Sequence, residues 1–158
     1  MCGKVGSDAW GVEYIENMKK FGINTNNFTR GEAQTGIASI FVAESGANSI
    51  VIIPGANNEI STFDVDAVSH EIQTARILVC QNEIPLTSTM RALEIAREHN
   101  TLSILNPAPA SPSLVSVINL CDIVCPNETE LAVITGMPVD TIPEVPAGKS
   151  HLFMHRCL

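Results

Sequence analysis

The feature that most constrains this chain is a threefold alternation of short apolar runs and helical patterns between residues 76 and 136. The apolar runs are "RILVCQ", "LSILN" and "DIVCPN", and each is followed by a segment with helical periodicity. Strands that are apolar at nearly every position are typical of a parallel sheet that helices cover on both faces. The sequence therefore predicts an α/β fold with a parallel sheet and flanking helices.

The first half of the chain shows different patterns. "TGIASIFVA" and "NSIVII" are rich in β-branched residues, and "ESGA" between them predicts a β-hairpin at about residues 35–53. Upstream of the hairpin, a helical pattern places Val12, Ile15 and Met18 on one face. The segment "NTNNFTRGEAQ" between them is typical of a polar loop.

Capping signals predict where further helices begin and end. Ser61 or Thr62 is expected to cap a helix that reaches about Gln73. The segment "PLTSTMRALEIAREHN" predicts the helix between the first two apolar runs, and Gly136 is expected to end the last helix.

Composition and charge exclude several classes of protein. Apolar residues make up 45% of the 158 residues, which predicts a folded domain. The net charge of −8 argues against a nucleic acid or an acidic membrane surface as a partner, because binding phosphate requires clustered Lys and Arg. No run of 18 apolar residues occurs, and the N-terminus lacks the apolar core of a secretion signal.

The five cysteines suggest reduced thiols and a cytoplasmic location, because the count is odd and no signal peptide is recognised. Cys121 and Cys125 match no paired metal-binding motif, so we expect them to pack in the core.

Polar residues follow all three predicted parallel strands. Glu83 comes after the first strand, Asn106 ends the second and Asn127 ends the third. In open α/β sheets, ligands bind outside the carboxyl ends of the strands, so this arrangement favours a binding cleft. The alternative is that these residues are polar only because they belong to loops.

Asn127 and Glu130 allow two interpretations. Their Asn-x-x-Glu spacing fits a capping box at the start of a helix. The other interpretation is a carboxylate that helps to hold Mg²⁺, which usually keeps several waters and takes one or two carboxylates together with substrate phosphates.

Two further motifs do not support a site. "PAGKS" at residues 146–150 ends like a phosphate-binding P-loop, but Pro143 stands where that motif requires its first glycine. His151 and His155 lie one helical turn apart, but the glutamate of the zinc-protease motif is missing.

Taken together, "VGSDAWG", "TGIASIFV", "PGANNEIS", "VCQNEIPL", "ILNPAPA" and "VCPNETELAVITG" resemble the middle of the ribokinase-type family of sugar and nucleoside kinases. The resemblance runs in order from about residue 3 to about residue 140. It implies a partial α/β kinase domain over residues 1–140, with the hairpin as a lid element. The segment 141–158 matches nothing expected there and is predicted to be a mobile tail.

The resemblance also implies roles for particular residues. Glu83 falls where the family hydrogen-bonds sugar hydroxyls, a role suited to a buried carboxylate. Ala38 and Ile50 fall where the lid forms apolar walls around the sugar. Asn127 falls where the family contacts ATP, and Glu130 is the glutamate of an N-x-x-E motif that organises Mg²⁺ and phosphate.

By the same resemblance, the activity is ATP-dependent phosphorylation of ribose with Mg²⁺, with a monovalent cation such as K⁺ and a homodimer formed through the lid. The family's "GGKGANQ"-like glycine motif and its "GAGD" motif, which carries the catalytic aspartate, do not occur in this sequence. Three hypotheses remain open: a ribokinase whose activity this chain alone lacks, a non-catalytic fragment or binding module, and a kinase for another sugar or nucleoside.

Overall fold

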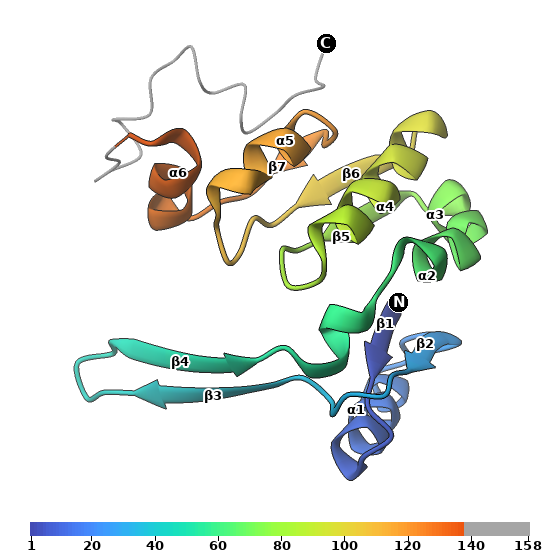
Figure 1. Ribbon diagram of the computed structural model, residues 1–158, viewed down its shortest axis with the longest axis horizontal. Helices are drawn as coiled ribbons and strands as arrows, with labels where there is room; N and C mark the ends of the chain where they lie inside the picture. The colour runs from blue at the N-terminus through green and yellow to red at the C-terminus, as the bar shows by residue number, and fades with distance from the viewer. Residues whose placement is uncertain (138–158) are drawn as a thin grey trace. The chain divides into compact units, whose positions relative to one another are not determined.

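The computed structural model describes residues 1–137, which form two compact units. Unit 1 is Met1–Ile60 and unit 2 begins at Ser61. Figure 1 shows the elements of both units in chain order. The segment 141–158, with the P-loop-like motif and both histidines considered above, lies outside the described residues.

Unit 1 opens with a small parallel sheet that the sequence did not predict. β1 (Cys2–Val5) pairs in parallel with β2 (Asn27–Arg30) along all four residues, and α1 (Ala9–Lys20) connects them. The prediction of a polar loop is therefore wrong at β2. The four residues "NFTR" carry little strand signal of their own, and they form a strand because β1 offers backbone hydrogen bonds beside them.

The helix α1 shows the predicted apolar face only in part. Ile15 and Met18 are half-buried, whereas Val12 stays exposed. Tyr14 instead makes an edge-to-face contact with Phe28 of β2, with the ring centroids 6.0 Å apart.

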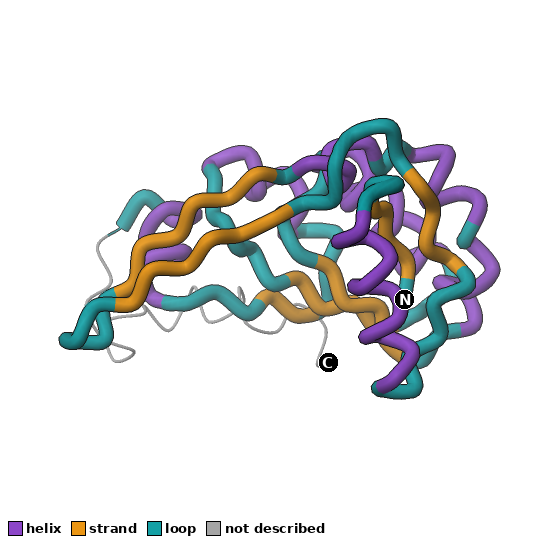
Figure 2. The backbone as a smooth tube through the Cα atoms, turned by 90° about the horizontal axis from the view of Figure 1, so that it is seen from below, coloured by secondary structure: helices purple, strands orange, loops and turns teal. Residues whose placement is uncertain are grey.

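The predicted hairpin is present. β3 (Ile37–Val42) pairs antiparallel with β4 (Asn48–Ile53), and Gly46 supplies a positive φ of 83° in the turn between them. Every residue of both strands is exposed. Figure 2 shows the two strands, in orange, running side by side. A short 3-10 helix, η1 (Gly55–Glu59), follows and ends unit 1.

Unit 2 contains the predicted βα alternation. Its elements are α2 (Thr62–Ala67), α3 (Ser69–Thr74), β5 (Ile77–Cys80), α4 (Leu86–Glu98), β6 (Leu102–Leu105), η2 (Pro112–Leu114), α5 (Val115–Ile118), β7 (Ile123–Val124) and α6 (Glu128–Thr135). The three strands form one parallel sheet in the order β5-β6-β7. The predicted parallel sheet with flanking helices is confirmed.

One predicted helix is divided in two. The segment expected to run from Ser61 to about Gln73 forms α2 and α3, with Val68 leaving helical geometry between them at φ −110° and ψ 18°. Ser61 is the N-cap, and it forms a complete capping box with Asp64.

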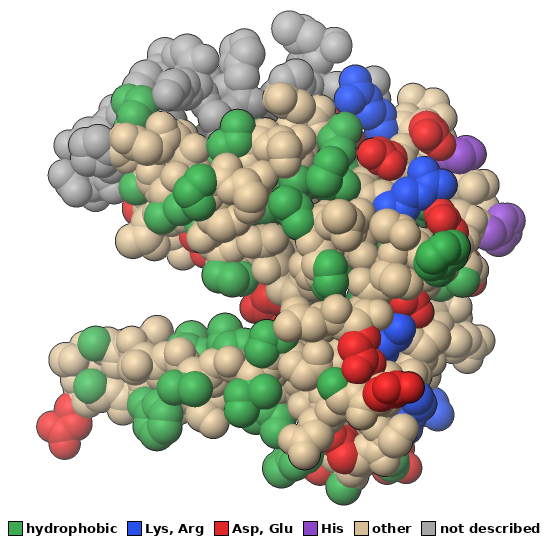
Figure 3. Space-filling view, viewed as in Figure 1, with side chains coloured by type: hydrophobic (Ala, Val, Ile, Leu, Met, Phe, Trp, Pro, Cys, Tyr) green, Lys and Arg blue, Asp and Glu red, His purple; other side chains and the backbone are tan. Residues whose placement is uncertain are grey.

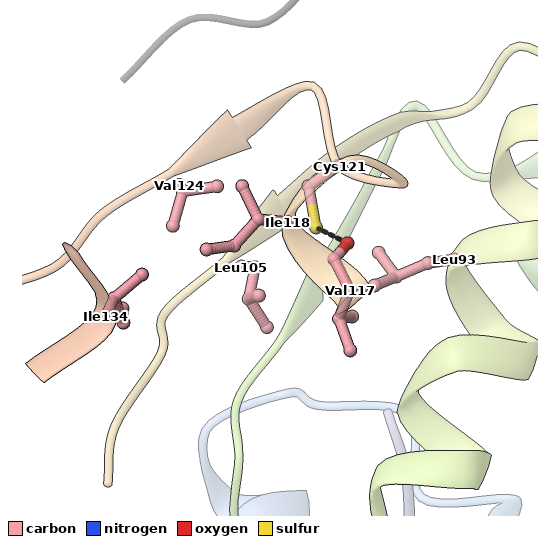
Figure 4. Close-up of a cluster of buried hydrophobic side chains, with 7 residues drawn as sticks. All are labelled: Leu93, Leu105, Val117, Ile118, Cys121, Val124 and Ile134. Carbon is pink, nitrogen blue, oxygen red and sulfur yellow. Dashed lines mark hydrogen bonds between the residues drawn. The ribbon is translucent and has the colours of Figure 1, made fainter. Parts of the chain in front are cut away.

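The core of unit 2 lies against one face of the sheet. Leu93 of α4 and Leu105 of β6 are fully buried, together with Val117 of α5 and Val124 of β7 (Figure 4). Leu78 and Cys80 of β5 pack against the same cluster. The helices α2, α3 and α6 also contribute buried side chains to this cluster or the adjoining one, namely Val65, Ile72 and Ile134.

The opposite face of the sheet differs from the prediction. Successive residues of a strand point to opposite faces, and Val79 of β5 is 64% exposed, with Ile77 and Leu102 also exposed. Helices therefore cover one face of β5-β6-β7 within the described residues, and the expected cover on both faces is not found there. Apolar side chains on this second face are therefore exposed in the part of the chain that the structure describes.

The cysteine predictions hold for one residue of the pair. Cys121 is buried, and its thiol donates to the Val117 carbonyl oxygen at 3.4 Å (Figure 4). Burial raises the pKa of that thiol to about 12. Cys125 is exposed, so the expectation that it packs in the core is wrong. It lies just beyond β7, where the chain leaves the sheet.

No helix among the described residues combines the length and hydropathy that crossing a bilayer requires.

Candidate functional site

The polar residues predicted to form a site follow neighbouring strands of one parallel sheet. β5 pairs with β6 and β6 with β7, so the carboxyl ends of all three strands lie at the same edge. Glu83, Asn106 and Asn127 each come shortly after one of these ends. The strand order thus brings the three loops to one edge, as the sequence predicted.

Glu83 lies in the loop between β5 and α4. Its side chain is exposed, and within the described residues it makes no hydrogen bond. The expectation of a buried carboxylate is therefore not met in this part of the chain. A carboxylate in this state has all its acceptor positions free for hydroxyl groups of a ligand.

The neighbouring residue, Asn82, ties the Glu83 loop to the loop after β6. Its backbone N–H donates to the Ala108 carbonyl oxygen at 3.0 Å, and its side-chain Nδ2 donates to the Pro109 carbonyl oxygen at 2.6 Å. The Asn106 N–H also donates to the Cys80 carbonyl oxygen at 2.9 Å. The two hydrogen bonds of Asn82 therefore hold the two loops together, and the bond from Asn106 joins the second loop to the end of β5.

Asn127 and Glu130 form a complete capping box at the start of α6. The Asn127 Oδ1 accepts from the Glu130 N–H at 2.8 Å, and the Asn127 N–H donates to Glu130 Oε2 at 2.8 Å. The Asn127 Nδ2 also donates to Glu130 Oε1 at 3.0 Å, and Thr129 donates its hydroxyl to Asn127 Oδ1. The capping interpretation is thus confirmed, and it leaves the ligand interpretation open.

The geometry of Glu130 is compatible with Mg²⁺ only as one contributor among several. A carboxylate has about four lone-pair positions, and the capping box uses two of them. In the part of the chain that the structure describes, no group of three or more Asp, Glu, His or Cys residues could hold a metal. A metal here would depend on water and phosphate oxygens for its remaining ligands, as Mg²⁺ commonly does.

The hairpin carries Ala38 and Ile50 in unit 1. Directly opposed residues of an antiparallel pair share a face, and Ala38 opposes Ile52 while Ile50 opposes Ile40. Ala38 and Ile50 therefore lie on the same face of the hairpin, as two apolar walls would require. Figure 3 shows hydrophobic side chains, in green, along the hairpin.

Sequence reasoning missed a polar cluster at the base of the hairpin. Asp8, the N-cap of α1, accepts from Thr35 just before β3, and Glu59 of η1 accepts from backbone N–H groups of the same segment. An Asp before a helical pattern signals the cap of α1. No local signal in the sequence shows that its second oxygen reaches a residue 27 positions away.

The match to known proteins extends over nearly the whole chain. A family model described as pfkB family carbohydrate kinase matches residues 1–151. The chain belongs to the pfkB family of carbohydrate kinases. The resemblance to ribokinase-type kinases is thereby confirmed.

Particular relatives of this pfkB-family chain are sugar kinases. It is 38% identical over 154 residues to a deoxyribokinase of Salmonella typhimurium, covering 96% of this chain and 50% of the relative. It is 42% identical over 135 residues to a ribokinase of Schizosaccharomyces pombe, covering 85% and 42%.

A solved ribokinase of Arabidopsis thaliana, complexed with ribose and ATP, matches with a TM-score of 0.74 and 28% identity. That match covers 90% of this chain and 47% of the plant protein. The chain thus spans about half the length of the relatives it matches.

Proposed function

We propose that this chain is part of a ribokinase, which transfers the terminal phosphoryl group of ATP to the 5-hydroxyl of ribose. The observation that carries the proposal is the edge of the parallel sheet. There the exposed carboxylate of Glu83 and the Asn127–Glu130 box follow strands of one sheet in a chain of the pfkB family. Relatives named ribokinase and deoxyribokinase, and the ribose and ATP complex of a solved relative, support it.

Glu83 and the hairpin are proposed to bind the sugar. The carboxylate accepts hydrogen bonds from two hydroxyl groups, and charge assistance makes such bonds stronger than neutral ones. Ala38 and Ile50, on one face of the hairpin, supply apolar contacts to the sugar ring.

Asn127 and Glu130 are proposed to act at the phosphate end of the site. Asn127 contacts ATP, and Glu130 holds waters around the metal while the capping box keeps its carboxylate in place. Mg²⁺ neutralises the negative charge of the phosphates when bound, and K⁺ is proposed as a further cation of the full enzyme.

This chain by itself is proposed to be inactive. The family's catalytic aspartate and anion hole belong to the "GAGD" motif, which is absent from this sequence. Loss of a single preorganised oxyanion donor lowers turnover by about 10²–10³-fold. The full enzyme is proposed to be a cytoplasmic homodimer that associates through the hairpin.

Deoxyribose is a second candidate substrate, because one of the relatives is a deoxyribokinase. Ribose and 2-deoxyribose differ by one hydroxyl, and a carboxylate such as Glu83 distinguishes them only if it contacts that hydroxyl. A kinase for another sugar and a non-catalytic fragment are two further hypotheses.

The test measures sugar-dependent ADP formation with ribose, 2-deoxyribose and fructose. For the purified 158-residue chain we expect no rate above background with any sugar, and a ribose-dependent rate would contradict its proposed inactivity. For a protein in which this chain is extended to the length of its relatives, we expect the highest kcat/KM with ribose. A higher kcat/KM with deoxyribose or fructose would refute the proposed specificity.

A further inference from the structure

The segment that leads into the hairpin, residues 32–36, is held by two carboxylates from distant parts of unit 1. We name it the strap. Three of its five backbone N–H groups, those of Glu32, Ala33 and Thr35, donate to carboxylate oxygens. Charge-assisted bonds of this kind are stronger than those between neutral groups.

Asp8 holds the strap from the start of α1. Its Oδ2 accepts from the Thr35 N–H at 2.8 Å, and its Oδ1 accepts from the Thr35 hydroxyl at 2.6 Å and from the Gly11 N–H at 2.9 Å. The Thr35 hydroxyl in turn accepts from the Gly6 N–H at 2.9 Å. Both oxygens of Asp8 are therefore used as acceptors.

Glu59 holds the strap from η1, on the other side of the hairpin in sequence. Its Oε2 accepts from the Glu32 N–H at 2.9 Å and its Oε1 from the Ala33 N–H at 2.8 Å. Ala56, in the same short helix, donates its N–H to the Gln34 carbonyl oxygen at 2.8 Å. The strap is thus bonded at four successive residues.

Close packing leaves the strap little room to move. A Cβ atom on Gly36 would lie 2.5 Å from the Pro54 carbonyl oxygen, and one on Gly6 would lie 2.6 Å from the Thr35 nitrogen. Gly55 has a φ of 53°, which other residues rarely adopt. The backbone segments on both sides of the hairpin base therefore approach each other closely at Gly36 and Gly55, and Gly6 approaches the strap from the segment after β1.

We propose that Asp8 and Glu59 are positioning residues that fix the base of the β3-β4 hairpin through the strap. Ala38 lies three residues beyond Thr35, so the two carboxylates determine where the sugar-facing part of the hairpin begins. The role of these residues in sugar binding rests on the function proposed above, whereas their role in fixing the base of the hairpin does not.

Amide isosteres separate this role from general stabilisation. An Asn or Gln side chain has one acceptor oxygen and one donor nitrogen, whereas the carboxylates of Asp8 and Glu59 use both oxygens as acceptors. In Asp8→Asn or Glu59→Gln, one NH₂ group must therefore face a backbone N–H, whichever way the amide is turned. Asn and Asp are about equally good N-caps, so Asp8→Asn can keep the cap of α1.

The experiment is hydrogen–deuterium exchange on the 158-residue chain, comparing wild type with Asp8→Asn, Glu59→Gln and the control Glu13→Gln. Glu13 is an exposed residue of α1 whose side chain makes no hydrogen bond in the described part, and its substitution removes the same charge. We expect exchange of the strap and of β3 and β4 to rise roughly tenfold in both test variants, because each loses a hydrogen bond to a charged group. The control should match wild type.

Amides of α1 beyond its first turn and of β1 and β2 should keep their wild-type exchange. If both test variants leave the hairpin unchanged, the proposal is wrong. It is also wrong if exchange rises equally throughout unit 1, because the carboxylates would then only stabilise the unit. No sugar is added, so an incorrect assignment of the substrate would not affect either result.

Discussion

The hairpin β3-β4 and the sheet β5-β6-β7 are both built from apolar strands, yet they are stabilised in different ways. The sheet buries one face under helices, and Leu105 and Val124 on that face are almost fully buried. The hairpin buries neither face, and its strands hydrogen-bond only to each other within the described residues. What holds the hairpin in place is polar: two carboxylates at its base.

This difference indicates which apolar residues stabilise the fold and which are available to bind a ligand or another chain. An apolar residue that is buried stabilises the fold, whereas an exposed apolar patch marks a surface that contacts a ligand or another chain. Substitutions in the sheet should therefore change the free energy of unfolding, and substitutions in the hairpin should change association or sugar binding.

The largest effect is expected from a matched pair of truncations. Leu93→Ala removes a fully buried side chain of unit 2 and should lower the free energy of unfolding by about 2–5 kcal/mol. Ile40→Ala removes a side chain that is 61% exposed and should change it by less than about 0.5 kcal/mol. Urea unfolding at low protein concentration measures both changes. Equal decreases in the free energy of unfolding would refute the expected difference between the sheet unit and the hairpin.

Self-association should instead depend on the exposed residues of the hairpin. The strands Ile37–Val42 and Asn48–Ile53 carry no charged residue, and such strand edges favour pairing with other chains. We expect the chain to form oligomers in size-exclusion chromatography, and Ile40→Lys to shift the peak towards the monomer. A Val79→Lys variant serves as the comparison on the exposed face of the sheet. If only this variant produces monomers, association occurs through the sheet.

The capping box at α6 should show a smaller effect that depends on the substitution. Asn127→Ala removes the N-cap and should lower the free energy of unfolding by about 1 kcal/mol. Glu130→Gln keeps a side chain that suits the box and should change it by less than about 0.5 kcal/mol. In an extended, active kinase, Glu130→Gln should nevertheless raise the Mg²⁺ requirement and lower turnover. If that variant affected stability alone, Glu130 would act only in capping.

The smallest effect is expected from the pH dependence of Asp8. Hydrogen bonds from the Thr35 hydroxyl, the Thr35 N–H and the Gly11 N–H lower the pKa of its carboxyl group below the ordinary value of 3.8. Because the folded-state pKa is the lower one, the stabilisation is complete above about pH 4 to 5 and disappears as the pH falls through the folded value. Urea unfolding between about pH 5 and pH 3 should show a smaller loss in Asp8→Asn than in wild type. An identical loss in both proteins would contradict the role of the charge.

The sequence by itself determined the elements whose signals are local. Continuous apolar runs predicted β5, β6 and β7, and the turn "ESGA" between β-branched runs predicted the hairpin. The spacing of Asn127 and Glu130 predicted their capping box, because a capping box involves only residues within one helical turn. The positions of Glu83 and Asn106 after their strands followed from the same alternation.

Only the tertiary structure decided features that join distant residues. The polar strand β2 exists because β1 lies beside it, and Asn82 bonds a loop that lies 27 positions further along the chain. The sequence pattern could not show which face of the sheet is covered, because an apolar strand looks the same whether one face or both are buried. Asp8 likewise looks like an ordinary helix cap, since its bond to Thr35 forms only when the fold brings the two residues together.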